Sequence, residues 1–218
     1  MRPKLLIFDL DGTLIDSRKD IAIAANWTRK KLGFSPQDPE FIANQIGGGV
    51  RNLLKRILPE LHDGQIKEGM DMFRGYYLEH CLNHTELYKG THEMLATLSK
   101  LKLAVVTNKP TDMSEKILAG LRVRKYFADV RGGDDVVKKK PDPVMLLEVL
   151  TDLHLLPDDA IMIGDSPVDV EAARRAKMRV CGVTYGGIGD PDHLIAAKPD
   201  FLAHSPAEVT ELFGKIPK

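Results

Sequence analysis

Cysteine is scarce in this chain, and neither sign of charge is in excess. The two cysteines among its 218 residues, Cys81 and Cys181, form no Cys-x-x-Cys pair. They therefore predict buried free thiols and argue against a disulfide framework or a zinc knuckle. Lysine plus arginine and aspartate plus glutamate both number 31, so the formal net charge is zero. An even balance gives no general electrostatic attraction to nucleic acid or to an anionic membrane.

Long apolar runs are also missing. No uninterrupted apolar segment approaches the length that spans a membrane, and Asp9 cuts the first apolar stretch too early for a secretory signal. With 43% hydrophobic and 28% charged residues, the composition is typical of a globular protein that has one large domain, or a core domain with a smaller insert. We therefore expect a cytoplasmic protein, monomeric or homodimeric, that acts on a small molecule and binds neither nucleic acid nor a membrane.

The most informative stretch lies near the start of the chain. An apolar run from Leu5 to Phe8 predicts a buried strand, and Asp9 and Asp11 follow it directly. Alternate side chains of an extended backbone point the same way, so the two carboxylates would leave the strand side by side. A bound cation or a shared proton would relieve their repulsion. A turn rich in aspartate is the alternative, whereas an EF-hand loop is disfavoured because Gly12 follows too soon.

Residues 17–84 carry only helical patterns. Ser17 and Asp20 predict a capping box at the start of a helix that ends near Gly33. From residue 85 onward strand and helix patterns alternate, and the strands expected over 103–107 and 161–164 are apolar throughout, as in a parallel sheet covered on both faces. The pattern predicts a doubly wound α/β core of residues 1–16 and 85–218, with a small all-helical domain of residues 17–84 inserted after the first strand.

Ligands of doubly wound sheets bind at the carboxyl ends of the strands. The polar residues expected at that edge are Asp9, Asp11, Thr107, Asn108, Asp165 and Asp169. Carboxylates without a cysteine or histidine cage favour Mg²⁺, although helix capping is an alternative for the last two aspartates. Lys140 would supply balancing positive charge, because Pro141 holds it at the start of a turn. These patterns alone do not decide which of Lys138, Lys139 and Lys140 points inward.

Four motifs in this order resemble those of the haloacid dehalogenase-like hydrolase superfamily. They are Asp9-x-Asp11-Gly-Thr, Thr107-Asn108, Lys140-Pro141 and Gly164-Asp165-Ser-x-x-Asp169. The resemblance spans the whole chain and implies a Rossmann-like core with residues 17–84 as a helical cap. It also implies an enzyme that hydrolyses phosphate monoesters with Mg²⁺.

The resemblance further implies a role for each motif residue. Asp9 would attack phosphorus and form an aspartyl-phosphate, while Asp11 would protonate the leaving oxygen and later activate water. The implied metal ligands are the side chains of Asp9 and Asp165 and the backbone carbonyl of Asp11, with Asp169 orienting the metal shell. The implied phosphoryl-binding residues are Thr107, Asn108 and Lys140, the last of which would also neutralise charge on Asp9.

Within the superfamily the chain resembles the phosphoglycolate phosphatases most. The likeness rests on the acid at position 11, on Gly47-Gly48-Gly49-Val-Arg51, on Val105-Val-Thr-Asn-Lys-Pro110 and on Tyr185-Gly-Gly, and it weakens at Leu87-Tyr-Lys-Gly-Thr91. We expect the glycines to bring N–H groups near an anion and Arg51 to grip a substrate carboxylate, although an exposed arginine after a loop is the alternative.

Three other functions stay open at this stage. They are a phosphomutase of the β-phosphoglucomutase type, a phosphatase for another small phosphorylated metabolite and a non-catalytic regulatory module. A dinucleotide site is disfavoured, because no Gly-x-Gly-x-x-Gly follows the first strand, and no P-loop motif occurs. A metal at His80 and His84 is less expected than two solvated histidines.

Overall fold

The fold is built on a six-stranded parallel sheet. In this computed structural model, which describes residues 3–134 and 138–214, the strand order is β5-β4-β1-β6-β7-β8. The strands are β1 (Leu5–Phe8), β4 (Lys102–Val106), β5 (Asp129–Arg131), β6 (Ala160–Gly164), β7 (Arg179–Val183) and β8 (Phe201–Ala203). Because later strands are added on both sides of β1, the carboxyl end of β1 is the switch point where such sheets bind ligands.

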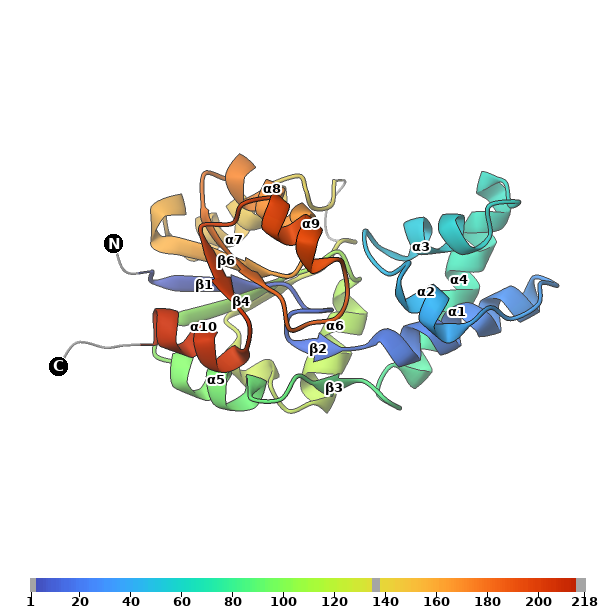
Figure 1. The fold of residues 1–218 in the computed structure, drawn as a ribbon, viewed down its shortest axis with the longest axis horizontal. Coiled ribbons are helices and arrows are strands. Elements are labelled where there is room, and N and C mark those ends of the chain that lie inside the picture. The colour runs from blue at the N-terminus through green and yellow to red at the C-terminus, as the bar shows by residue number, and fades with distance from the viewer. Residues whose placement is uncertain (1–2, 135–137, 215–218) are drawn as a thin grey trace.

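Helices cover both faces of this sheet (Figure 1). Leu5 and Ile7 of β1 belong to one apolar cluster, whose helices are α7 (Val144–Asp152), α8 (Pro167–Arg175) and α9 (Pro191–Ala196). Leu6 and Phe8 belong to the opposite cluster, whose helices on this face of the sheet are α5 (Thr91–Leu98), α6 (Thr111–Gly120) and α10 (Pro206–Phe213). Alternate residues of one strand therefore enter two separate apolar layers, and the prediction of a doubly wound α/β sheet is confirmed.

Four helices form a second body beside the sheet (Figure 1). These helices, which we call the helical part, are α1 (Arg18–Lys31), α2 (Pro39–Ala43), α3 (Val50–Ile57) and α4 (Asp63–His80). Helices α1 and α4 pack together, and the rings of Trp27 and Tyr76 stack between them with centroids 4.7 Å apart. A two-stranded antiparallel ribbon of β2 (Ile15–Asp16) and β3 (Glu86–Leu87) joins the helical part to the sheet.

The helix start at Ser17 differs from its prediction. Ser17 occupies the N-cap position, but its side chain makes no capping hydrogen bond and donates to Asp11 instead. Asp20, expected in a capping box, accepts hydrogen bonds from the backbone N–H groups of His84 and Thr85 and from the Thr85 hydroxyl, at 2.8–2.9 Å. The buried carboxylate therefore ties together the two segments that connect the helical part to the sheet.

The remaining differences concern short elements. The sequence patterns did not predict the β2–β3 ribbon, α9 or β8, each of which has six residues or fewer. Cys81 and Cys181 are free and buried, as expected. Across residues 3–134 and 138–214, no helix has the length and apolar character that crossing a membrane requires.

Candidate active site

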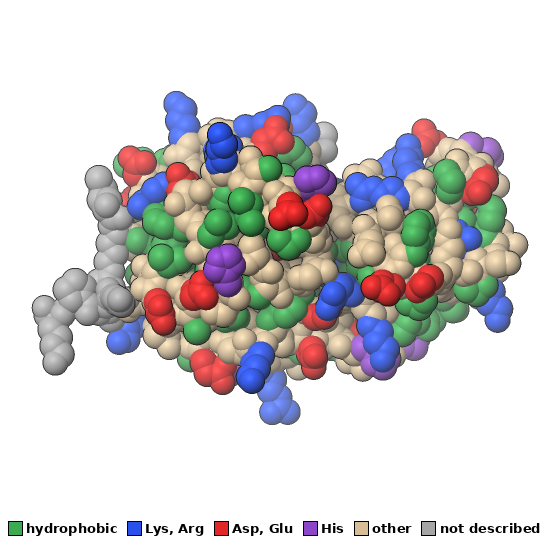
Figure 2. Space-filling view, in the orientation of Figure 1, with side chains coloured by type: hydrophobic (Ala, Val, Ile, Leu, Met, Phe, Trp, Pro, Cys, Tyr) green, Lys and Arg blue, Asp and Glu red, His purple; other side chains and the backbone are tan. Residues whose placement is uncertain are grey.

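A cavity of about 350 Å³ lies between the carboxyl ends of the central strands and the helical part. The outline of the molecule narrows between these two bodies in Figure 2. Seven of the eight residues predicted for the site line the cavity: Asp9, Asp11, Thr107, Asn108, Lys140, Asp165 and Asp169. The eighth, Arg51, does not line it. Segments far apart in the sequence thus meet at the predicted edge of the sheet.

Asp9 and Lys140 form a buried ion pair at the end of β1. The Lys140 Nζ lies 3.0 Å from Asp9 Oδ1 and 2.7 Å from Asp169 Oδ1, and it donates to the carbonyl of Val106 at 2.8 Å. Burial raises the pKa of Asp9 to about 6, although the Lys140 charge opposes this effect. Burial lowers the pKa of Lys140, but the two carboxylates outweigh it and keep the ammonium charged. Lys138 and Lys139 are exposed, so Lys140 is the inward lysine.

Asp11 has a separate set of donors. The Ser17 hydroxyl donates to Asp11 Oδ1 at 2.5 Å, and the Nζ of Lys109 lies 2.9 Å from Asp11 Oδ2. Because each aspartate of the pair has its own buried ammonium group, the expected repulsion between Asp9 and Asp11 is offset in two places. Lys109 belongs to the stretch Val105–Pro110 that resembles the phosphoglycolate phosphatases, but the sequence patterns predicted no role for it.

Asp165 and Asp169 arrive from the end of β6 and the first turn of α8. Asp169 Oδ2 accepts from the backbone N–H and the hydroxyl of Ser166, so both of its oxygens have donors within the protein. Asp165 accepts from the Thr13 hydroxyl through Oδ1. The backbone of Gly12, which has φ +83°, packs directly against this carboxylate. A Cβ atom at Gly12 would lie 2.1 Å from Asp165 Oδ2. Only glycine allows this approach.

The acidic groups suit a divalent cation. Ligand oxygens of Asp9, Asp165 and Asp169 lie within 4.8 Å of one another. Four carboxyl groups face two ammonium groups at this edge, so the site carries an excess of two negative charges when all four are ionised. Burial and the charges of the neighbouring aspartates raise the pKa of Asp165 well above its usual range. An all-oxygen donor set with excess negative charge fits Mg²⁺. Asp169 already accepts three hydrogen bonds from Lys140 and Ser166, which suits its predicted role of orienting the metal shell.

Thr107 and Asn108 differ in what their side chains contact. Both line the cavity, and Thr107 is almost fully buried. The Asn108 amide donates through Nδ2 to the Lys140 carbonyl at 3.1 Å and accepts through Oδ1 from the Lys140 N–H at 2.9 Å. Asn108 therefore fixes the backbone of Lys140 with its side chain, a contact that its predicted role as a phosphoryl ligand did not include.

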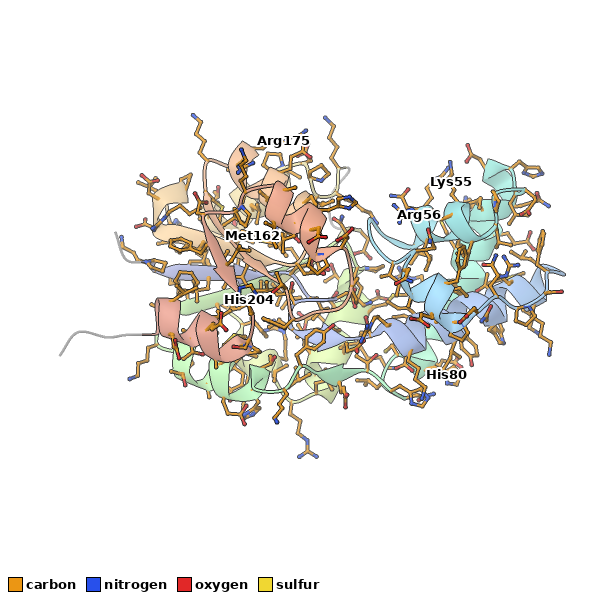
Figure 3. All side chains as sticks on the ribbon, in the orientation of Figure 1. Lys55, Arg56, His80, Met162, Arg175 and His204 are labelled. Carbon is orange, nitrogen blue, oxygen red and sulfur yellow. The ribbon has the colours of Figure 1, made fainter. Side chains whose placement is uncertain are left out.

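The helical part supplies the opposite wall of the cavity. Its glycine loop, residues 47–49, has positive φ at all three positions and lines the cavity together with α3. Arg51 does not line the cavity, and its guanidinium pairs with Asp63 at 2.8 Å. Its placement therefore does not support the predicted contact with a substrate carboxylate. Arg56, which lies on the same helix (Figure 3), does line the cavity. Its Nη1 donates to the carbonyls of Gln45 and Gly47 at 2.8 and 3.1 Å and so braces the loop.

Comparisons with known proteins agree with this geometry. The sequence model of the haloacid dehalogenase-like hydrolase family matches residues 6–183. Two relatives named phosphoglycolate phosphatase, from Aquifex aeolicus and Chromobacterium violaceum, are 38% and 39% identical, and each match covers 96% of both chains. A crystal structure described as a predicted phosphoglycolate phosphatase from Haemophilus somnus superposes with a TM-score of 0.89 at 30% identity, covering 97% of this chain and 98% of the other.

Proposed function

Because this chain belongs to the haloacid dehalogenase-like hydrolase family, we propose that it is a Mg²⁺-dependent phosphatase that forms an aspartyl-phosphate and acts on 2-phosphoglycolate. Its sequence similarity to the phosphoglycolate phosphatases identifies it as a phosphoric monoester hydrolase. The observation that supports the mechanism is the meeting of Asp9, Lys140 and Asp165 at one edge of the sheet, where all three line one cavity. A cavity of about 350 Å³ is near the small end of ligand sites, which suits a small metabolite.

Asp9 is the proposed nucleophile. A phosphate ester is an anion, so a carboxylate can approach it only where positive charge offsets the repulsion. Lys140 supplies part of that charge and holds Asp9 Oδ1, while Asp169 and the Asn108 amide fix Lys140 in place. Mg²⁺ held by Asp9 and Asp165, with the backbone carbonyl of Asp11, would supply the rest of the charge and orient the phosphoryl oxygens. The Thr107 hydroxyl is the proposed donor to those oxygens.

Asp11 is the proposed acid and base. It lines the same cavity as Asp9, so it is placed to protonate the leaving oxygen while Asp9 attacks phosphorus. When the aspartyl-phosphate is hydrolysed, the same carboxylate takes the proton from the attacking water. Residues 17–84 are the proposed cap over this chemistry, with residues 1–16 and 85–218 as the catalytic core.

Arg56 is the proposed partner for the carboxylate of 2-phosphoglycolate. It lines the wall opposite Asp9, and only Nη1 is used by the carbonyls of Gln45 and Gly47. A guanidinium has further N–H donors that can pair with a carboxylate. Arg51 on the same helix is exposed and paired with Asp63, so it provides a matched control.

Phosphate release from a panel of phosphate esters, measured with Mg²⁺ and with EDTA, tests the proposal. The wild-type protein should release phosphate only with the metal, and Asp9→Asn should abolish release. Arg56→Ala should raise KM for 2-phosphoglycolate about ten- to hundredfold, because a hydrogen-bonded charge is worth roughly 1.5–3 kcal/mol, while KM for p-nitrophenyl phosphate stays within about twofold. Arg51→Ala should change neither value. Equal effects of Arg56→Ala on both substrates would remove the carboxylate role, and no turnover of any ester would refute the proposal.

A further inference from the structure

A second buried lysine stands beside the proposed acid and base. The residue Lys109 is 8% exposed, and its Nζ lies 2.9 Å from Asp11 Oδ2. The same Nζ donates to the Tyr77 hydroxyl at 3.1 Å and lies 4.7 Å from the centroid of the Tyr77 ring. Lys109 follows β4 in the core, whereas Tyr77 belongs to α4 of the helical part. One ammonium group therefore connects the two bodies at the acid and base.

Keeping a charge at this place requires compensation. An ammonium group loses its hydration when it is buried, and it is tolerated only when it is paired and hydrogen-bonded. Apolar packing against the Tyr77 ring needs no charge, because a methionine side chain would supply it equally well. The contacts that need the charge are the ion pair with Asp11 and the cation–π contact with the Tyr77 ring, and the ion pair with Asp11 is the one that reaches the proposed acid and base.

The two oxygens of Asp11 are held through the first and the last helix of the helical part. Ser17, whose hydroxyl donates to Oδ1 at 2.5 Å, is the N-cap of α1, the first helix of that part. Lys109, at Oδ2, is joined to Tyr77 near the end of α4, the last helix of that part. The direction in which Asp11 points thus depends on contacts with both ends of the helical part.

We propose that Lys109 is a positioning residue that orients the Asp11 carboxyl group toward the leaving oxygen. Through its contact with Lys109, Tyr77 makes this orientation depend on the docking of the helical part. The inference rests on the proposed phosphatase function. In the first step the bond between Asp9 oxygen and phosphorus forms, the ester bond breaks, and the proton of Asp11 moves to the leaving oxygen. In the second step water attacks phosphorus, Asp9 is released, and the water proton returns to Asp11. Lys109 also lines the cavity, but in this proposal it acts on the reaction through Asp11.

Leaving groups of different basicity separate this role from a structural one. Phenoxide leaves less readily than p-nitrophenoxide and needs the proton of Asp11 more. We expect Lys109→Met to lower kcat/KM for phenyl phosphate at least tenfold more than for p-nitrophenyl phosphate. For p-nitrophenyl phosphate we expect kcat to fall more than kcat/KM, because hydrolysis of the aspartyl-phosphate still needs Asp11 as a base. Asp11→Asn should give the same pattern with larger losses.

Two further variants complete the experiment. Tyr77→Phe keeps the ring but removes the hydroxyl that Lys109 contacts, and should give the same pattern with losses of about two- to fivefold. Lys116 also reaches from the core to α4, where its Nζ donates to the Leu78 carbonyl at 2.5 Å. Lys116→Met therefore removes a lysine from the same junction without touching Asp11, and should leave both substrates within about twofold of the wild-type values.

The outcomes distinguish the two proposals. Equal losses on both aryl phosphates in Lys109→Met, or no loss, would overturn the role of Lys109 while leaving the phosphatase function intact. If Lys109→Met does not fold, Tyr77→Phe tests the inference in its place. An unchanged ratio of kcat/KM for phenyl phosphate to kcat/KM for p-nitrophenyl phosphate in Tyr77→Phe would also overturn the inference. Absence of turnover by the wild-type protein would instead overturn the proposed function itself.

Discussion

Replacing Asp20 by alanine tests the connection between the two bodies of the molecule. The residue Asp20 is 3% exposed, and its Oδ2 accepts from the N–H groups of His84 and Thr85 and from the Thr85 hydroxyl. These three bonds join the start of α1 to the segment that returns from α4 to β3. Asp20→Ala removes the shared acceptor of all three donors at once, so it should destabilise the protein far more than an ordinary surface substitution.

The magnitude follows from the burial of the donors. Thr85 is buried, so its N–H and hydroxyl cannot recover a partner from water, whereas His84 is exposed and can. A hydrogen bond to a charged acceptor contributes roughly 1.5–3 kcal/mol, and the low end of that range for two buried bonds amounts to about 3 kcal/mol. Thr85→Val removes only the hydroxyl and should cost about 1.5 kcal/mol.

Urea unfolding at neutral pH measures these free energies. Glu93 is a matched control, because it is an exposed acid at the third position of α5, as Asp20 is at the third position of α1. Glu93→Ala should cost only the helix-dipole interaction, about 0.3–1 kcal/mol. A loss in Asp20→Ala no larger than the loss in Glu93→Ala would refute the argument that this carboxylate fastens the two connections.

Two other perturbations address the metal site. Gly12→Ala should abolish Mg²⁺-dependent activity, because the new Cβ would collide with Asp165. Gly33→Ala is the control: its φ of +84° is similar, but none of the described atoms lies within 4 Å of the added Cβ, so only the loss of about 1–2 kcal/mol of stability from the left-handed backbone should be common to both variants. Activity retained in Gly12→Ala would contradict the geometry. Because the pKa of Asp9 is raised from 3.8 to about 6 in the folded state, the metal-free protein should lose stability as pH rises between these two values. Mg²⁺ should therefore raise Tm more at pH 8 than at pH 5. Thermal scans with Mg²⁺ and with EDTA measure this shift, and the same shift at both pH values would contradict the assigned cause.

The two buried lysines divide the chemistry of the site. Lys140 lies with Asp9 and Asp169, where bond making to phosphorus is proposed, and Lys109 lies with Asp11, where proton transfer is proposed. An acid and a nucleophile two residues apart would otherwise share one electrostatic environment. Separate ammonium partners allow the two carboxylates to keep different roles.

The longer strands of the sheet and the identity of the acids could be predicted from local pattern. Short apolar runs such as Leu5–Phe8 are typical of buried strands, and in a parallel sheet the polar residues that follow such strands meet at its carboxyl edge. The short elements β2 and β3 could not be predicted, because two residues carry no periodicity and their pairing depends on a partner about 70 positions away.

Side-chain partners across the two bodies were decided by tertiary structure alone. Sequence by itself determined the fold class, the edge of the sheet at which the site lies and the acids that reach it, because strand period and strand ends are local properties. It could not determine that Arg56 rather than Arg51 lines the cavity, since a helix on a loop can turn either residue inward. Nor could it show that Asp20 reaches Thr85 or that Lys109 reaches both Asp11 and Tyr77, because these contacts exist only once the helical part is docked against the sheet.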